Sequence, residues 1–307
     1  MPRAGGILMT RFSANVLLLV TGALWGGGFV AQSKGMTSIG PLSFIGLRFA
    51  IAALAVLPFA LWESRRAPEP LERRNWSPFL WIGVAMFAGS VAQQVGLTAT
   101  SVSNSGFLTS LYVIMVPLLG IAFFRSPPHW VVWPAATAAM TGVYLLSGGA
   151  TGALNAGDLD TILCAVFWAI QIVLVGKYAS RTGRPLTLAF TQFVVTGALG
   201  LAAGLCTERI DQTAIWAAAP SILYAGLIAG ALAFTLQMVA QRFTTSSNAA
   251  IMLASEAPFA ALFGALFLGE RLSPIALFGG ALIVAAMVAV ELVPQWNGRR
   301  LASIAER

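Results

Sequence analysis

Long apolar runs, each about the length of a membrane-spanning helix, follow one another through almost the whole chain. The hydrocarbon core of a bilayer is about 30 Å thick, so a helix needs about 20 apolar residues to cross it. Such runs lie at about 14–33, 41–62, 76–97, 103–124, 128–147, 158–177, 185–205, 219–240, 247–268 and 274–292. Short breaks that carry turn residues or charges separate them. The pattern predicts an all-α integral membrane protein with ten transmembrane helices.

Composition agrees with a membrane environment. Hydrophobic residues make up 58% of the 307 residues and charged residues only 9%. A soluble protein carries roughly a quarter charged residues, because water must solvate its surface. No break between the apolar runs is long enough for an extramembrane domain. The basic start, MPRAGGILMTRF, precedes an apolar run without a clear cleavage site, so we interpret that run as a first transmembrane helix.

The basic residues are distributed unevenly between the two sides of the predicted membrane. With the N-terminus in the cytoplasm, the cytoplasmic segments hold Arg3, Arg11, Arg65, Arg66, Arg73, Arg74, Arg125, Lys177, Arg181, Arg184, Arg242, Arg299, Arg300 and Arg307. The outer segments hold Lys34, Arg209 and Arg271, and Arg48 lies within a span. Cytoplasmic loops of membrane proteins are enriched in Lys and Arg. The asymmetry predicts that both termini are cytoplasmic, and it accounts for the net charge of +7 without a nucleic-acid partner.

The two halves of the chain resemble each other. At an offset of 144 residues, Pro41 aligns with Pro185, Gln93 with Gln237, and Gly120 with Gly264; Trp25 and Trp168 align at 143. This predicts two repeats, residues 1–150 and 151–307, of five helices each. Because five is odd, the second repeat enters the membrane from the opposite side. Inverted repeats are typical of secondary transporters, which place the substrate near the midplane between the halves.

The repeat motifs resemble a known family. The stretch SNAAIMLASEAPFAALFGALFLGERLSP is similar to the second-half signature of the drug/metabolite transporter superfamily, of the ten-helix EamA type. GALWGGGFV and PLSFIGLRFA are similar to its first-half openings, whereas FFRSPPHW departs from the pattern. Within the superfamily the chain looks most like bacterial exporters of aromatic and other uncharged amino acids. The resemblance implies transport across the bacterial inner (plasma) membrane.

Polar and aromatic residues at helical spacing mark the faces that we expect to line a cavity. Trp25 and Trp168 stand out, because they lie mid-span at repeat-related positions, away from the interfacial belts where tryptophan is common. Packing between helices and interhelical hydrogen bonding remain alternative roles for the others. The predicted substrate-binding and cavity residues are Trp25, Gly28, Ser90, Gln94, Phe107, Leu111, Tyr112, Trp168, Gln171, Phe234, Gln237, Ser255 and Glu256.

Glu256 and Arg48 are charged residues within predicted spans. A carboxyl at this depth is unfavourable in lipid, so Glu256 is expected to face the protein interior. It lies near Pro258, which deprives the Ala254 carbonyl of its helical partner, as Pro117 does for Val113. Glu256 is predicted to be a proton carrier, a partner for a substrate ammonium or a structural hydrogen-bond acceptor. Arg48 is predicted either to pair with a carboxylate or carbonyl or to extend toward the interface.

We therefore expect an exporter of amino acids or related metabolites that works by alternating access, as a monomer or a homodimer in contact with lipid. A multidrug exporter of the same superfamily is the alternative. A membrane-embedded enzyme is a remote one, because the chain has no HExxH motif and no intramembrane Asp pair. No cofactor and no metal are expected, since the chain has one histidine and two cysteines without a CxxC motif.

Overall fold

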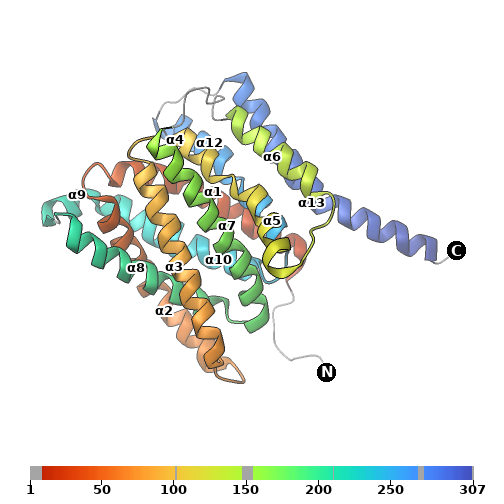
Figure 1. Cartoon of the computed structure of the whole chain (residues 1–307), viewed down its shortest axis with the longest axis horizontal. Helices are drawn as coiled ribbons and strands as arrows, with labels where there is room; N and C mark the ends of the chain where they lie inside the picture. Colours follow the sequence, from red (N-terminus) through yellow and green to blue (C-terminus); the bar gives the residue numbers. More distant parts are fainter. Residues whose placement is uncertain (1–8, 101, 147–154, 210, 269–272, 306–307) are drawn as a thin grey trace.

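The computed structural model describes residues 9–100, 102–146, 155–209, 211–268 and 273–305, and within them the regular elements are helices only. Figure 1 shows these helices as one bundle, with α13 extending beyond it. The elements are α1 (Arg11–Gly35), α2 (Pro41–Arg66), α3 (Arg73–Gly96), α4 (Val102–Thr109), α5 (Tyr112–Phe124), α6 (Val132–Leu146), α7 (Ala156–Thr182), α8 (Pro185–Thr207), α9 (Gln212–Leu223), the π-helix η1 (Tyr224–Leu232), α10 (Ala233–Ala240), α11 (Ser246–Leu253), α12 (Glu256–Leu268) and α13 (Pro274–Ala305).

The helices correspond to the apolar runs of the sequence. Within the described residues, nine helical segments are long and apolar enough to cross a membrane, and α6 is a shorter apolar helix. This confirms the predicted all-α membrane fold with about ten spans. The fourth predicted span is divided into α4 and α5, the eighth into α9, η1 and α10, and the ninth into α11 and α12. The predicted boundary between the repeats, at residues 150 and 151, lies outside the described residues.

Helices of the two halves pack against one another. The most extensive contact joins α2 with α8, the second helices of the two halves, and α6 packs along α13, the fifth helix of the second half. The contact of α3 with α7 is as extensive as that of α6 with α13, and α1 packs along η1 and α10; these pairs join the third helix of one half with the first helix of the other. The α2–α8 contact is close: a Cβ added at Gly200 would lie 2.7 Å from the Gly46 nitrogen. Small residues permit such close approach between membrane helices.

Two glutamates cap the α2–α8 pair at its opposite ends. Leu42 and Ser43, in the first turn of α2, donate backbone N–H bonds of 2.9 and 2.8 Å to the carboxylate of Glu208. Leu186 and Thr187, in the first turn of α8, donate equivalent bonds of 3.0 and 2.8 Å to Glu63. A carboxylate satisfies unpaired N–H groups at a helix N-terminus and interacts favourably with the helix dipole.

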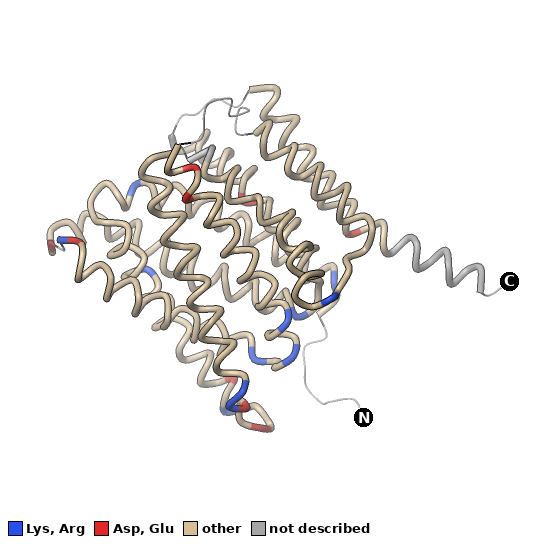
Figure 2. The backbone as a smooth tube through the Cα atoms, viewed as in Figure 1, with Lys and Arg blue, Asp and Glu red and all other residues tan. Residues whose placement is uncertain are grey.

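Lys and Arg residues gather at the end of the bundle from which α1 starts (Figure 2). We call this the basic end. Its described members are Arg11, Arg65, Arg66, Arg73, Arg74, Arg125, Lys177, Arg181, Arg184 and Arg242. Lys34 and Arg209 lie at the opposite end, where α1 and α8 finish. This distribution agrees with the charge asymmetry from which the orientation was predicted.

Candidate functional site

A narrow cavity lies inside the bundle, between helices of both repeats. The centres of water molecules can occupy about 50 Å³ of this cavity, so it has room for a few of them. It extends toward the end opposite the basic end, because Gln32 and Gln93 line it close to the C-terminal ends of α1 and α3. Its lining residues are Trp25, Gly28, Phe29, Gln32, Arg48, Phe49, Gln93, Thr109, Tyr112, Trp168, Gln171, Ile172, Ala225, Ala229, Phe234 and Glu256.

Aromatic rings from both repeats form one wall of this cavity. The ring of Phe234 lies 4.6 Å from that of Trp25 and 5.7 Å from that of Trp168, measured between centroids. Phe49 approaches Phe234 from α2 at 6.2 Å. These separations are those of favourable aromatic pairs. The wall therefore offers a broad apolar surface to a ligand in the cavity.

The π-helix η1 helps to position this wall. The indole N–H of Trp25 donates a bond of 2.9 Å to the carbonyl of Ala229, within η1. Ala225 and Ala229 of the same segment also line the cavity, and their small side chains leave room beside the tryptophan. π-helical turns are rare and are frequent at functional sites. The eighth span therefore contacts the candidate site through η1, by the bond to Trp25 and by the side chains of Ala225 and Ala229.

Glu256 and Tyr112 meet in another part of the cavity lining. The phenol of Tyr112 donates a hydrogen bond of 3.1 Å to Oε1 of Glu256, and only 2% and 4% of the two residues is exposed. Glu256 therefore faces the protein interior. The two residues are separated by the repeat offset of 144, so this bond joins equivalent positions of the two halves. A carboxyl and a phenol thus form one hydrogen-bonded pair, a contact that the sequence analysis did not anticipate.

Both residues begin a helix directly after a break in a span. Tyr112 is the first residue of α5 and Glu256 the first of α12. At the breaks, the N–H of Val113 donates to the carbonyl of Ser110 at 3.0 Å, and that of Ala257 to Ala254 at 3.2 Å. Pro258 has no N–H to donate to the Ala254 carbonyl, and a tighter turn at the break supplies the N–H of Ala257 in its place.

Four glutamine side chains lie in a buried network beside the cavity. Gln171 donates to Gln192 at 3.3 Å, Gln237 donates to both Gln171 and Gln241 at 3.2 and 2.9 Å, and Gln241 donates to the Ile172 carbonyl at 3.0 Å. All four side chains come from the second repeat. Amides that are linked in this way hold membrane helices together, and only Gln171 reaches the cavity.

The structure brings part of the predicted site together. Trp25, Gly28, Tyr112, Trp168, Gln171, Phe234 and Glu256 line the cavity. The other predicted residues, Ser90, Gln94, Phe107, Leu111, Gln237 and Ser255, do not belong to its lining. The ring of Phe107 packs against that of Tyr144, with 5.6 Å between centroids. Ser255 packs against Gly22 of α1. Binding of a substrate by the lining residues stays a prediction.

Several lining residues were not among the predicted ones. Arg48, the basic residue deep within a span, is the most informative, and its isolation in the sequence was a signal. Gln93 could have been found as the repeat partner of Gln237. Phe29, Phe49 and Ile172 are ordinary apolar residues, and nothing in the sequence separates them from the residues that face lipid.

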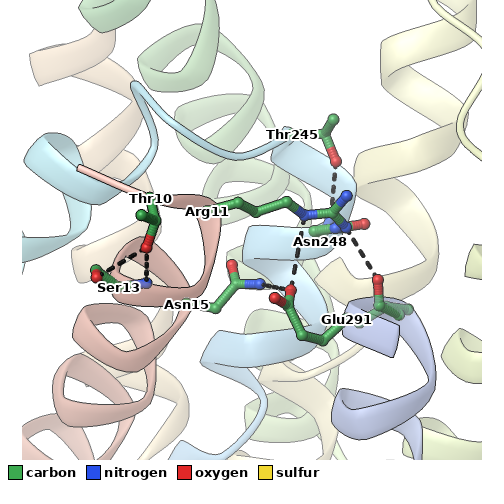
Figure 3. Close-up of polar contacts among 8 residues, drawn as sticks. Thr10, Arg11, Ser13, Asn15, Thr245, Asn248 and Glu291 are labelled. Atoms are coloured by element: carbon green, nitrogen blue, oxygen red, sulfur yellow. Dashed lines mark hydrogen bonds and ion pairs between the residues drawn. The ribbon is translucent and has the colours of Figure 1, made fainter. Parts of the chain in front are cut away.

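Polar contacts join the two repeats at the basic end. Arg11 and Asn15 of α1 meet Glu291 of α13 (Figure 3): Nε of Arg11 lies 3.6 Å from a carboxylate oxygen to which the Asn15 amide also donates. Arg11 donates a further bond of 2.9 Å to the carbonyl of Val290. Nearby, the hydroxyl of Thr245 caps α11 by accepting from the N–H of Asn248 at 3.3 Å. These contacts hold α1 against α13 at the basic end, and the cavity extends toward the opposite end.

Among the described residues, no group of three His, Cys, Asp or Glu side chains is arranged to hold a metal ion. The polar chemistry of the cavity is therefore provided by amides, hydroxyl groups, one carboxyl and one guanidinium. These groups can bind and orient a small molecule.

Comparison with known proteins decides the family. The model of the EamA-like transporter family matches this chain twice, at residues 12–148 and 155–292. The chain belongs to this family. An uncharacterized transporter of Archaeoglobus fulgidus is 32% identical over 285 residues, which are 92% of this chain and 87% of the relative. The threonine/homoserine exporter RhtA of Escherichia coli is 27% identical over 299 residues, with 89% of each chain covered.

A solved crystal structure shares this fold. It superposes with a TM-score of 0.77 over 95% of this chain and 99% of the other, at 17% sequence identity. That likeness concerns the fold alone. Together with the family, the membrane-spanning helices make this chain a multi-pass membrane transporter. The internal cavity is accordingly the candidate binding site of an EamA-like transporter.

Proposed function

We propose that this EamA-like transporter exports uncharged amino acids, aromatic ones included, or closely related metabolites, by alternating access. The observation that carries the proposal is the cavity between the repeats, with the rings of Trp25, Trp168 and Phe234 on one wall and the Glu256–Tyr112 pair on another. An apolar wall suits an apolar side chain, while a few buried polar groups fix the orientation of the ligand. The exporter RhtA, a relative by sequence, acts on threonine and homoserine by its name.

The arrangement of the helices supports alternating access. The cavity extends toward the end opposite the basic end, and the contacts of Arg11 and Asn15 with Glu291 hold the basic end together. Breaking these contacts and forming equivalent ones at the other end would move the opening across the membrane. Two similar halves can exchange conformations in this way. We further propose the bacterial inner membrane as the location, with both termini in the cytoplasm.

Uptake of labelled amino acids into proteoliposomes, with and without a pH gradient, tests the proposal. We expect saturable uptake of uncharged amino acids, and Trp25→Ala and Trp168→Ala should weaken the apparent affinity about 10-fold or more, because each removes a large apolar contact. Trp76→Ala, which alters an exposed tryptophan outside the cavity, is the control. Normal affinity in both cavity variants would place the site elsewhere.

The same assay separates the second candidate, a multidrug exporter, which the aromatic wall also favours. Such a transporter would carry large apolar cations and none of the amino acids. A panel that includes ethidium beside phenylalanine and threonine therefore distinguishes the two substrate classes. Uptake of ethidium alone would contradict the proposed substrate class while leaving the transporter family unchanged.

A further inference from the structure

Arg48 is a buried cation in the wall of the cavity. It lies in the second turn of α2, lines the cavity beside Gln32 and Phe49, and only 5% of the residue is exposed. The neighbouring backbone is fixed, because a Cβ added at Gly226 of η1 would lie 2.9 Å from the Arg48 carbonyl. Its low exposure and its place in the cavity lining put the Arg48 side chain inside the bundle and not at the lipid surface.

Arg48 has no polar partner within the described chain. It forms no hydrogen bond or ion pair with any described residue, and its Nε is buried without an acceptor. The guanidinium lies 4.5 Å from the centroid of the Phe49 ring and 5.8 Å from that of Phe44. Aromatic faces orient a cation, but they replace only part of the hydration that it loses on burial. Both predicted roles, a paired arginine and one that extends to the interface, are therefore wrong for the described residues.

No carboxylate of the described residues forms an ion pair with Arg48. Glu256, which lines the same cavity, accepts the hydrogen bond of Tyr112. Glu63 and Glu208 cap helices at the two ends of the bundle. The repeat counterpart of Arg48 is Gln192, which belongs to the buried amide network. The site is therefore asymmetric, with an unpaired cation contributed by the first repeat alone.

We propose that Arg48 binds the carboxylate of the transported molecule. This inference rests on the proposed function and deepens it, because it limits the substrates to molecules that carry a carboxylate beside an apolar group. A guanidinium presents a planar pair of donors that matches a carboxylate, and the bound anion supplies the charge and the acceptors that the protein does not. The aromatic wall formed by Trp25, Trp168 and Phe234 then receives the apolar part of the same molecule.

Two ligand pairs that differ in the carboxylate test this inference on the full-length purified protein. The first pair is L-phenylalanine and L-phenylalaninamide, compared by inhibition of amino-acid uptake into proteoliposomes. The second pair is phenylacetate and phenethylamine, compared by the thermal stabilisation of the protein in detergent, which needs no transport. In each pair, we expect the compound with the carboxylate to bind about 10-fold more tightly, or better, than the compound without it. Charge-assisted hydrogen bonds have this strength.

Arg48→Gln should abolish this preference in both assays, and Arg48→Lys should retain part of it, since it keeps the charge but loses the bidentate geometry. Arg66→Gln is the matched control. It removes an arginine that stacks on Trp62 at 4.7 Å at the other end of α2, outside the cavity, and should change nothing. Should Arg48→Gln fail to fold, a reduced but not abolished preference in Arg48→Lys supports the inference, and an unchanged preference contradicts it.

The outcomes separate this inference from the proposed function. Uptake of amino acids with an unchanged preference in both Arg48 variants overturns the role of Arg48 and leaves the proposed function intact. Absence of amino-acid uptake, together with phenylacetate binding that requires Arg48, overturns the proposed function and supports a carboxylate site for another substrate. If neither carboxylate is preferred by the wild-type protein, the inference about Arg48 is wrong.

Discussion

At the residue scale, the rotation of each helix decides which polar side chains face the cavity and which pack between helices. Glu256 was recognisable in the sequence, because a carboxyl in an apolar run is unusual, and so was the pair of repeat-related tryptophans. What the sequence could not supply is the direction in which a polar side chain of a span points around the bundle. Gln171 and Gln237 occur in similar apolar surroundings, yet only Gln171 reaches the cavity. Such differences depend on helix rotation, which packing against distant helices determines. Some of the predicted residues therefore line the cavity, and the others pack between helices outside it.

At the residue scale, we predict that the Tyr112–Glu256 hydrogen bond is mainly structural. Tyr112→Phe leaves a buried carboxyl without its donor and should lower the free energy of unfolding by about 1–3 kcal/mol. Glu256→Gln keeps an oxygen that accepts from Tyr112, so its loss should be smaller. Thermal unfolding in detergent gives the stabilities, and uptake per folded molecule gives the activity, which should stay normal in Glu256→Gln.

The opposite pattern would contradict this assignment. Unchanged stability with lost transport in Glu256→Gln would mean that the carboxyl acts on the substrate or carries a proton. A proton carrier would lose only the component of transport that a pH gradient drives, whereas a partner for a substrate ammonium would bind more weakly at every pH.

At the element scale, the helices follow from the sequence more closely than their interruptions do. The length and hydropathy of the apolar runs determine the spans, because each run must cross the same hydrocarbon thickness. Pro117 and Pro258 pointed to weak positions in the fourth and ninth spans, where the structure has breaks. The π-helical segment of the eighth span had no such signal. It lies where Gly226 packs closely on the backbone of α2, and such packing between distant helices is not encoded by any local pattern.

The caps on α2 and α8 provide a prediction at this scale. Glu63→Ala and Glu208→Ala should each lower the free energy of unfolding by about 1 kcal/mol, because each leaves two N–H groups of a helix start without an acceptor. The two sites lie at opposite ends of helices more than 20 residues long, so they share no partner, and the double variant should lose the sum.

Glu72→Ala is the control for the caps. Glu72 pairs with Arg74 in an exposed position, and exposed ion pairs contribute little to stability. Thermal unfolding of the four variants side by side measures the effects. A Glu208→Ala protein as stable as Glu72→Ala would show that water replaces this cap without loss.

At the scale of the whole molecule, the number of spans was predicted, whereas the pairing of helices between the halves was not. The offset of 144 residues shows which positions are equivalent, but it does not say which of them touch. In the structure α2 packs on its counterpart α8, and Tyr112 bonds to its counterpart Glu256. Both contacts relate a position to its own repeat partner. Other contacts between the halves, such as that of α3 with α7, join positions that are not repeat partners, so the offset alone does not determine the interface.

The last prediction concerns the orientation of this bundle in the membrane. Because Lys and Arg gather at the basic end, that end should face the cytoplasm. In a Cys206→Ser background, which removes the exposed native cysteine and keeps the buried Cys164, we introduce Asp211→Cys at the opposite end and Arg73→Cys at the basic end. A membrane-impermeant maleimide should label Asp211→Cys in intact cells and Arg73→Cys only after the membrane is permeabilised. Labelling of Arg73→Cys in intact cells would reverse the orientation, and with it the side of the membrane toward which the cavity of this structure extends.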